Sequence, residues 1–113
     1  MPIYMLNICY DPTAPPPSGP SNQPQHAALE AELREQGVYV GGAGLFPVGH
    51  LPALRLRGSK ALDGPFTESK EALGGFFVVE CDDYEQAKTI AERIAVNERS
   101  WIEIRQVGIW RPK

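Results

Sequence analysis

The stretch Gly74-Gly75-Phe76-Phe77-Val78-Val79-Glu80-Cys81 decides the fold of this chain. The four residues from Phe76 to Val79 are all apolar, so they lack the alternation of a strand with one wet face. A short run of this kind is typical of a strand that is covered on both faces. The run Ile3 to Tyr10 (IYMLNICY) is equally short and apolar, and it predicts a second such strand.

A first helix is predicted over residues 22–37, between two strands. Asn22 with Gln25 three residues later resembles a capping box, and Gly37 is a stop signal. The buried stripe of this helix consists of two leucines, Leu29 and Leu33. His26 lies three and seven residues before these leucines, so it sits on or beside the stripe.

A second helix is predicted to start at Asp82-Asp83. Either Asp83 with Gln86 or Asp82 with Glu85 forms its cap pair. Apolar residues then recur at the spacing of a core-facing stripe, namely Ala87, Ile90, Ala91 and Ile94.

The remaining segments predict shorter strands and turns. Residues 38–46 form a strand with three glycines in four positions, which weaken a strand unless something must approach its backbone closely. Residues 53–57 alternate apolar and basic side chains, so they form a strand with a wet or partner-facing side. Residues 60–62 fit a further short strand, residues 67–73 fit one or two helical turns, and residues 101–110 form the last strand.

Four main strands and two long helices in this order predict an α+β fold, a ferredoxin-like βαββαβ sandwich with helices on one face of an antiparallel sheet. The other face needs cover as well, because the strands at residues 3–10 and 76–81 are apolar on both sides. A monomer would expose a large apolar patch, which soluble proteins avoid. We therefore predict a homodimer in which two copies pack sheet to sheet as a dimeric α+β barrel.

Length and composition describe one mildly acidic globular domain. The chain has 113 residues, so residues 1–113 are expected to form a single domain. A net charge of −3 argues against nucleic-acid and anionic-membrane partners, and no apolar run is long enough to span a membrane. No signal peptide is visible at the N-terminus, and Cys9 and Cys81 cannot form a multi-bridge scaffold. We expect a cytoplasmic protein whose two reduced thiols are buried in apolar strands.

Residues 11–24 contain six prolines. Proline removes backbone donors and blocks helices, so this segment predicts a loop within the domain. The composition leaves open whether the loop is a lid over a cleft, a clamp on a partner subunit or a surface loop without such a role.

Known metal and phosphate motifs are missing from the sequence. Cys9, Cys81, His26 and His50 lie far apart without closely spaced ligand pairs, so no metal site is predicted. The run Gly41-Gly42-Ala43-Gly44 leads toward a turn and not into a helix, which makes it a poor phosphate cradle. We therefore expect neither a metal nor another cofactor.

His26 is the main candidate for proton transfer, because imidazole titrates near neutrality. It either borders a cleft beside the glycine-rich strand or is a half-packed residue at a helix start. Asp63 fits two roles, an orienting partner for such an imidazole or a turn residue whose carboxylate caps backbone amides. Four arginines either bind a carboxylate substrate, face solvent or pair between subunits: Arg55, Arg57, Arg105 and Arg111.

The segment Asp63-Gly64-Pro65-Phe66-Thr67-Glu68-Ser69-Lys70-Glu71, followed by Leu73-Gly74-Gly75-Phe76, resembles the DGPF branch of the YCII-related proteins. The resemblance extends to the glycine-rich strand at residues 41–45 and to the closing strand at residues 102–107. It implies a dimeric α+β barrel and a similarity to small lyase-like enzymes with a His–Asp pair.

The resemblance also implies site residues. His26-Ala27-Ala28-Leu29, with Gly37 further on, fits the family position of the histidine. The end of this helix carries Glu35-Gln36 and no aspartate, so the pair is either incomplete or rebuilt with Asp63.

Three functions remain open at this point. The first is a lyase- or isomerase-like enzyme without a cofactor, in which His26 moves a proton on a small organic molecule with help from Asp63 or Glu68. Its substrate-binding residues would be Gly42, Gly44, Phe66, Glu68 and Lys70. The second is a non-catalytic metabolite-binding or regulatory dimer, and in the third the segment 63–71 serves only to close the dimer.

Overall fold

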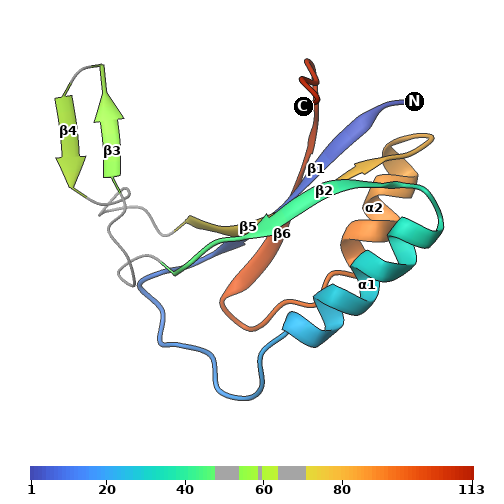
Figure 1. Cartoon of the computed structure of the whole chain (residues 1–113). Helices are drawn as coiled ribbons and strands as arrows, with labels where there is room; N and C mark the ends of the chain where they lie inside the picture. Colours follow the sequence, from blue (N-terminus) through green and yellow to red (C-terminus); the bar gives the residue numbers. More distant parts are fainter. Residues whose placement is uncertain (48–53, 59, 64–70) are drawn as a thin grey trace.

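The computed structural model describes residues 1–47, 54–58, 60–63 and 71–113. Its elements follow one another as β1 (Ile3–Tyr10), α1 (Gln23–Glu35), β2 (Tyr39–Gly44), β3 (Leu54–Arg57), β4 (Lys60–Asp63), β5 (Ala72–Glu80), α2 (Tyr84–Glu92) and β6 (Ser100–Gln106). Four strands form an antiparallel sheet in the order β2-β5-β1-β6, and β3 pairs with β4 in a separate two-stranded sheet. Both helices lie on one face of the larger sheet (Figure 1). The predicted ferredoxin-like α+β fold is confirmed.

The core lies between the two helices and the sheet. Alternation along β1 turns Tyr4 and Leu6 toward the helices, and the register places Val79 and Phe77 of β5 beside them. The predicted stripes of both helices complete this core, as Leu29, Leu33, Ala87, Ile90, Ala91 and Ile94 are all buried. Hydrophobic burial on this one face therefore accounts for the two-layer arrangement.

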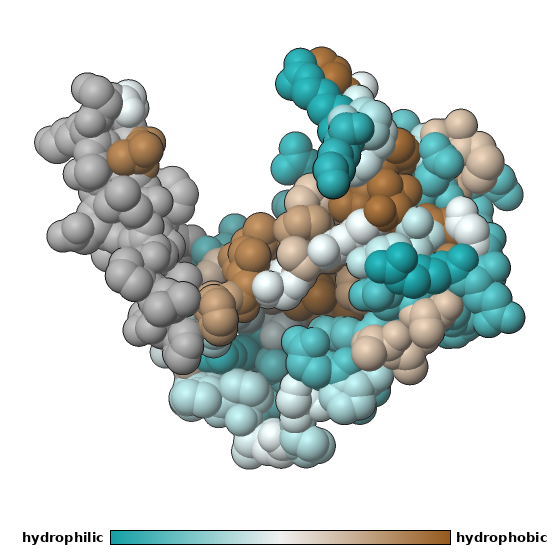
Figure 2. Space-filling model, in the orientation of Figure 1, coloured by the Kyte–Doolittle hydropathy of each residue, from teal (hydrophilic) through white to brown (hydrophobic). Residues whose placement is uncertain are grey.

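The opposite face of the sheet carries no helix. We call it the open face, and the register assigns to it the apolar side chains of Met5, Leu73, Phe76, Val78 and Trp101. Figure 2 shows apolar side chains gathered along this side of the sheet, beside the C-terminal tail. The sequence predicted cover on both faces, and within the described residues no helix supplies it on this side.

Several strand boundaries differ from the prediction by one or more residues, and two of these differences are explained by strand pairing. β5 begins at Ala72, so Ala72 and Leu73 are strand residues and not part of a helical turn, because Ala72 pairs with Tyr10 of β1. β6 ends at Gln106 instead of residue 110. Its neighbour β1 starts at Ile3, and the hydrogen bond from Val107 N to Ile3 O (2.8 Å) closes the pairing of the two strands just beyond Gln106.

The helix starts confirm one cap and correct another. Asp83 accepts a hydrogen bond from Gln86 N (2.9 Å), so the Asp83–Gln86 alternative is the one that forms. Asn22 makes no side-chain cap, and the predicted capping box with Gln25 was wrong. Ser21 Oγ accepts from Gln23 N instead (3.1 Å), because the residue before the cap is within reach of the first free amide.

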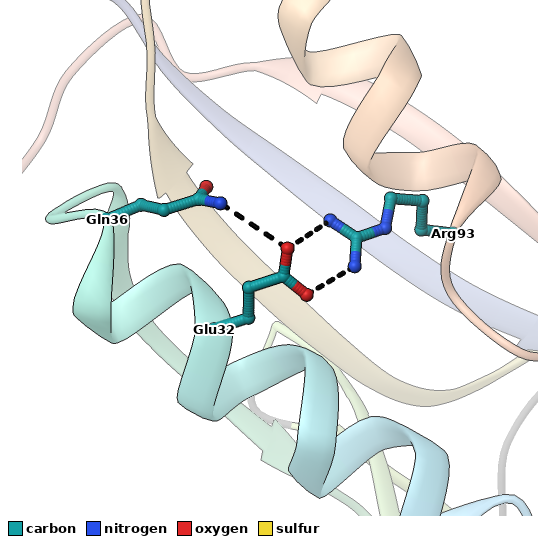
Figure 3. Close-up of polar contacts among 3 residues, drawn as sticks. All are labelled: Glu32, Gln36 and Arg93. Carbon is teal, nitrogen blue, oxygen red and sulfur yellow. Dashed lines mark hydrogen bonds and ion pairs between the residues drawn. The ribbon is translucent and has the colours of Figure 1, made fainter.

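An ion pair joins the two helices on their outer side (Figure 3). Arg93, at the end of α2, donates from both terminal guanidinium nitrogens to the two carboxylate oxygens of Glu32 in α1. Gln36 also donates to this carboxylate, with Nε2 at 3.4 Å from Oε1. The hydrogen bonds from Arg93 lower the pKa of Glu32 below its ordinary value.

The lowered pKa predicts a pH dependence of stability. A carboxyl whose pKa is lower in the folded chain contributes stability above its unfolded pKa of about 4.3, and that contribution is lost as the pH falls through the folded value. Replacing Glu32 by glutamine should therefore lower the melting temperature slightly near about pH 7 and leave it unchanged near about pH 2. Thermal unfolding over this range tests the prediction. Glu92→Gln, which changes an exposed carboxylate on α2, is the matched control. Its melting temperature should fall at acid pH as that of the parent chain does.

Candidate functional site

A cavity of about 350 Å³ lies between the first half of α1 and the sheet. We call it the α1 cavity. Its floor includes backbone of β2 and β5, and the segment between α2 and β6 contributes a third wall. Its side chains with titratable or hydroxyl groups are Tyr10, His26, Glu30, Tyr39, Arg99 and Ser100. Size and mixed lining suit a small organic molecule.

The cavity exists because glycines replace side chains on the helix-facing side of two strands. The register turns Gly42 and Gly44 of β2 and Gly75 of β5 toward α1, where the paired positions of neighbouring strands carry Phe77 and Ile8. A glycine leaves the layer between sheet and helix unfilled at each of these positions. The glycine-rich strand predicted from the sequence is therefore the source of the space.

The two glycines that were predicted to bind substrate, Gly42 and Gly44, differ in what surrounds them. A Cβ on Gly42 would lie 2.6 Å from Phe76 O and 2.9 Å from the Tyr39 hydroxyl, so it is the neighbouring strand and Tyr39 that require glycine there. A Cβ on Gly44 would meet only Gln23 Nε2, at 4.0 Å. Gly44 thus borders open space that a ligand can enter, whereas Gly42 is first a requirement of the sheet.

A pair of alanine substitutions tests this distinction. Gly42→Ala is expected to lower the free energy of unfolding by about 1–3 kcal/mol, because its methyl group overlaps a backbone carbonyl that is fixed by strand pairing. Gly41→Ala, whose Cβ would meet nothing within 4 Å, should be neutral or stabilising by up to about 1 kcal/mol. Chemical denaturation of both variants measures the difference. Equal stabilities would contradict the assignment.

His26 lies in the first turn of α1 and is half-buried. Its Nε2 is 2.8 Å from Ala95 O, in the segment that follows α2, and its ring meets the Phe77 ring edge-on with centroids 6.0 Å apart. A carbonyl oxygen only accepts, so Nε2 carries the proton of this hydrogen bond. In the neutral ring the lone pair is then on Nδ1, which is the nitrogen that can take up a proton.

Tyr39 and Glu30 form a second polar group in the cavity. The Tyr39 hydroxyl donates to Glu30 Oε1 (3.4 Å), and Arg34 Nε donates to Glu30 Oε2 (2.9 Å). Burial and the nearby Glu30 raise the pKa of Tyr39, so its phenol stays protonated at neutral pH and acts as a donor. Tyr39 was not predicted as a site residue. The only local signal is that Glu30 and Arg34, which both contact it, lie four residues apart on α1.

Arg99 is a further cavity residue that the sequence did not single out. It directly precedes β6, and Asp11 N donates to its carbonyl oxygen (3.0 Å), which ties it to the end of β1. Arg105, one of the four arginines proposed for carboxylate binding, instead lies on the open face. Arg111 is in the exposed C-terminal tail. The side chains of Arg55 and Arg57 lie outside the described part of the chain.

The structure brings together some of the predicted site residues. His26, Gly42 and Gly44 all line the α1 cavity. Asp63 is the last residue of β4, in the separate two-stranded sheet, and its side chain is not among those described. Phe66, Glu68 and Lys70 also lie outside the described residues. The His26–Asp63 pair therefore stays a prediction.

In the part of the chain that the structure describes, metal-ligating and thiol groups do not form a second centre. Among the described residues, no group of three or more His, Cys, Asp or Glu side chains is placed to hold a metal ion. Cys81 is buried as predicted, whereas Cys9 is only half-buried on the open face. Burial raises the pKa of both thiols, which disfavours the reactive thiolate. No helix in residues 1–47 or 71–113 is long and apolar enough to cross a membrane.

Comparison with known families gives one finding that covers nearly the whole chain. The family model described as the YCII-related domain matches residues 3–111. A comparison with curated proteins gives no match.

Proposed function

The chain belongs to the YCII-related domain family, and on this premise we propose that its α1 cavity binds a small organic molecule on which His26 acts as a general base. The reaction would be a lyase- or isomerase-like proton transfer that uses no cofactor. The base would be Nδ1 of His26, which removes a proton from a carbon next to a carbonyl or carboxyl group. Tyr39 would turn from its long hydrogen bond to Glu30 (3.4 Å) and donate instead to the oxygen on which negative charge develops.

The observation that carries the proposal is the hydrogen bond between His26 Nε2 and Ala95 O. It defines the neutral tautomer and holds the ring at the cavity wall, which are the two conditions for a positioned base. Within the described residues no other hydrogen bond of the His26 ring is seen, so Nδ1 has no competing donor there.

We further propose that the chain is of the DGPF branch and that residues of the segment 63–71 take part in the site. Asp63 or Glu68 would then orient or assist His26, and Phe66 and Lys70 would contact the substrate. The similarity of this segment to the DGPF motif supports the assignment. The unpaired state of Cys9 and Cys81 agrees with a cytoplasmic location, which we also propose.

A second candidate is a non-catalytic metabolite-binding or regulatory module. One observation favours it: within the described residues the partner of His26 is a backbone carbonyl and not a carboxylate. A carbonyl holds the ring but stabilises an imidazolium less than a carboxylate does. The module would use the same cavity and bind the same class of molecule without turning it over.

We propose that either form is a homodimer, with a second copy of the chain on the open face. The apolar side chains of Met5, Leu73, Phe76, Val78 and Trp101 share this face. Met5 of the central strand β1 is paired with Val78 of the central strand β5. A self-complementary contact around a two-fold axis is the commonest way to cover such a face.

Exchange of carbon-bound hydrogen for deuterium tests the catalytic proposal without knowledge of the full reaction. The wild-type chain is incubated in D₂O with a panel of small oxo acids, lactones and unsaturated acids, and loss of the C–H signal is followed by proton NMR. Exchange that is faster than in buffer supports a general base. Binding without exchange favours the second candidate, and no binding by any member of a broad panel contradicts both.

A further inference from the structure

Arg99 has a guanidinium group whose hydrogen-bonding capacity is largely unused. Its side chain is half-buried and lines the α1 cavity together with His26. It also lines a second hollow, of about 510 Å³, whose other walls include prolines, Trp101 and the two acidic residues Asp11 and Glu98. Arg99 therefore lies between the α1 cavity and the proline-rich loop at residues 11–24.

Within the described part of the chain, the contacts of this guanidinium leave its charge unpaired. Nη1 donates to Ala14 O at a long 3.5 Å, and Nε is buried without a hydrogen-bond partner among these residues. Cζ lies 4.9 Å from the centre of the Tyr10 ring. The ring attracts the cation but offers no lone pairs in the guanidinium plane. Among the described residues, ion pairs join Arg34 to Glu30 and Arg93 to Glu32, and none reaches Arg99.

The other charged group of the cavity does not compensate Arg99. Glu30 already accepts hydrogen bonds from Arg34 and from Tyr39. An arginine stays protonated at every physiological pH, so its charge cannot be removed by titration. A partly buried cation with an unpaired N–H group at a cavity wall is an arrangement that an anion stabilises.

We propose that Arg99 is the anion-binding residue of the α1 cavity and that the molecule bound there carries a carboxylate. This inference rests on the proposed function, since it assigns a chemical class to the ligand of that cavity. Arg99 holds the carboxylate through paired N–H···O bonds, with a small rotation of the side chain that brings Nε to the cavity surface. The remainder of the ligand lies toward the glycine backbone of β2 and β5, beneath His26.

Benzoate and its neutral counterpart benzamide are the probes for this test. They have nearly the same shape, so a difference in affinity reports the charge. Titration of the full chain, followed by ¹H–¹⁵N NMR, gives both affinities and observes the Arg99 Nε–H signal directly. We expect benzoate to bind about 10- to 100-fold more tightly than benzamide and to shift the Arg99 Nε–H resonance.

Three variants test whether Arg99 is the cause of tighter binding of benzoate than of benzamide. Arg99→Met should reduce the affinity for benzoate to that for benzamide, and Arg99→Lys should retain part of the preference because it retains the charge. Arg105→Met, which removes an exposed arginine from the open face, is the matched control and should bind benzoate as the wild type does.

Each contrary result points to a different failure. Equal binding of the two probes to the wild type overturns the anion site but leaves the cavity as a ligand site. Loss of the preference in Arg105→Met also overturns it, because the attraction would then be general. If neither probe binds, the inference fails and the proposed function is weakened with it. If Arg99→Met does not fold, the wild-type comparison and the Nε–H signal still decide.

Discussion

Replacing His26 by glutamine is expected to slow deuterium exchange on a reactive substrate by a factor of about 10²–10⁴. Glutamine can place an N–H donor near Ala95 O, so the contact that links α1 to the end of α2 can persist. It cannot accept a proton at neutral pH. The variant therefore removes the proposed base while it retains the hydrogen bond that positions it.

The comparison needs evidence that folding and binding survive. His26→Gln should unfold within a few degrees of the wild type, and the affinity for the substrate should change far less than the exchange rate. Gln25→Ala, an exposed change in the same turn of α1, should leave the exchange rate unaltered. A His26→Gln protein that exchanges as fast as the wild type would exclude His26 as the base and favour a binding module.

Leu73→Glu is expected to convert the proposed dimer to a monomer. Leu73 is 40% exposed in the single chain, so a glutamate there can reach water in a monomer. In a sheet-to-sheet dimer the carboxylate would be buried opposite apolar side chains without a partner, at a cost of several kcal/mol. Because the two-fold axis repeats the change in both subunits, the dissociation constant should rise by about 10³-fold or more.

Analytical ultracentrifugation over a range of concentrations measures this effect. Val96→Glu is the matched control, since Val96 is 42% exposed but lies in the segment after α2, away from the open face. It should sediment as the parent chain does. A wild-type chain that is monomeric at every concentration, or a Leu73→Glu variant that stays dimeric, would refute the sheet-to-sheet arrangement.

Local chemistry was sufficient to predict some elements closely. β1 spans Ile3–Tyr10 as predicted, because an apolar run between Pro2 and Asp11-Pro12 has few alternatives. The Asp83–Gln86 cap formed because both partners lie within one helical turn. The end of β6 was misjudged, because strand length depends on where the neighbouring strand stops.

The candidate site was predicted only in part, for a related reason. His26 and the glycine-rich strand were singled out from their own sequence neighbourhoods, and both line the α1 cavity. Arg99 was missed, because it lies 88 positions from Asp11, whose backbone holds it at the end of β1. The burial of its Nε without a hydrogen-bond partner among the described residues is a property of the packed chain and not of any local pattern.

The sequence by itself determined the order of helices and strands, the apolar stripes and the existence of a two-layer α+β core, since these follow from periodicity and from caps within a few residues. Only the tertiary structure decided that Gly42 is required by a neighbouring carbonyl while Gly44 borders open space, and that His26 donates to Ala95 O. The physical reason is distance along the chain. Hydrophobic pattern specifies which face is buried, whereas the groups that meet across that buried layer are set by strand register and helix packing.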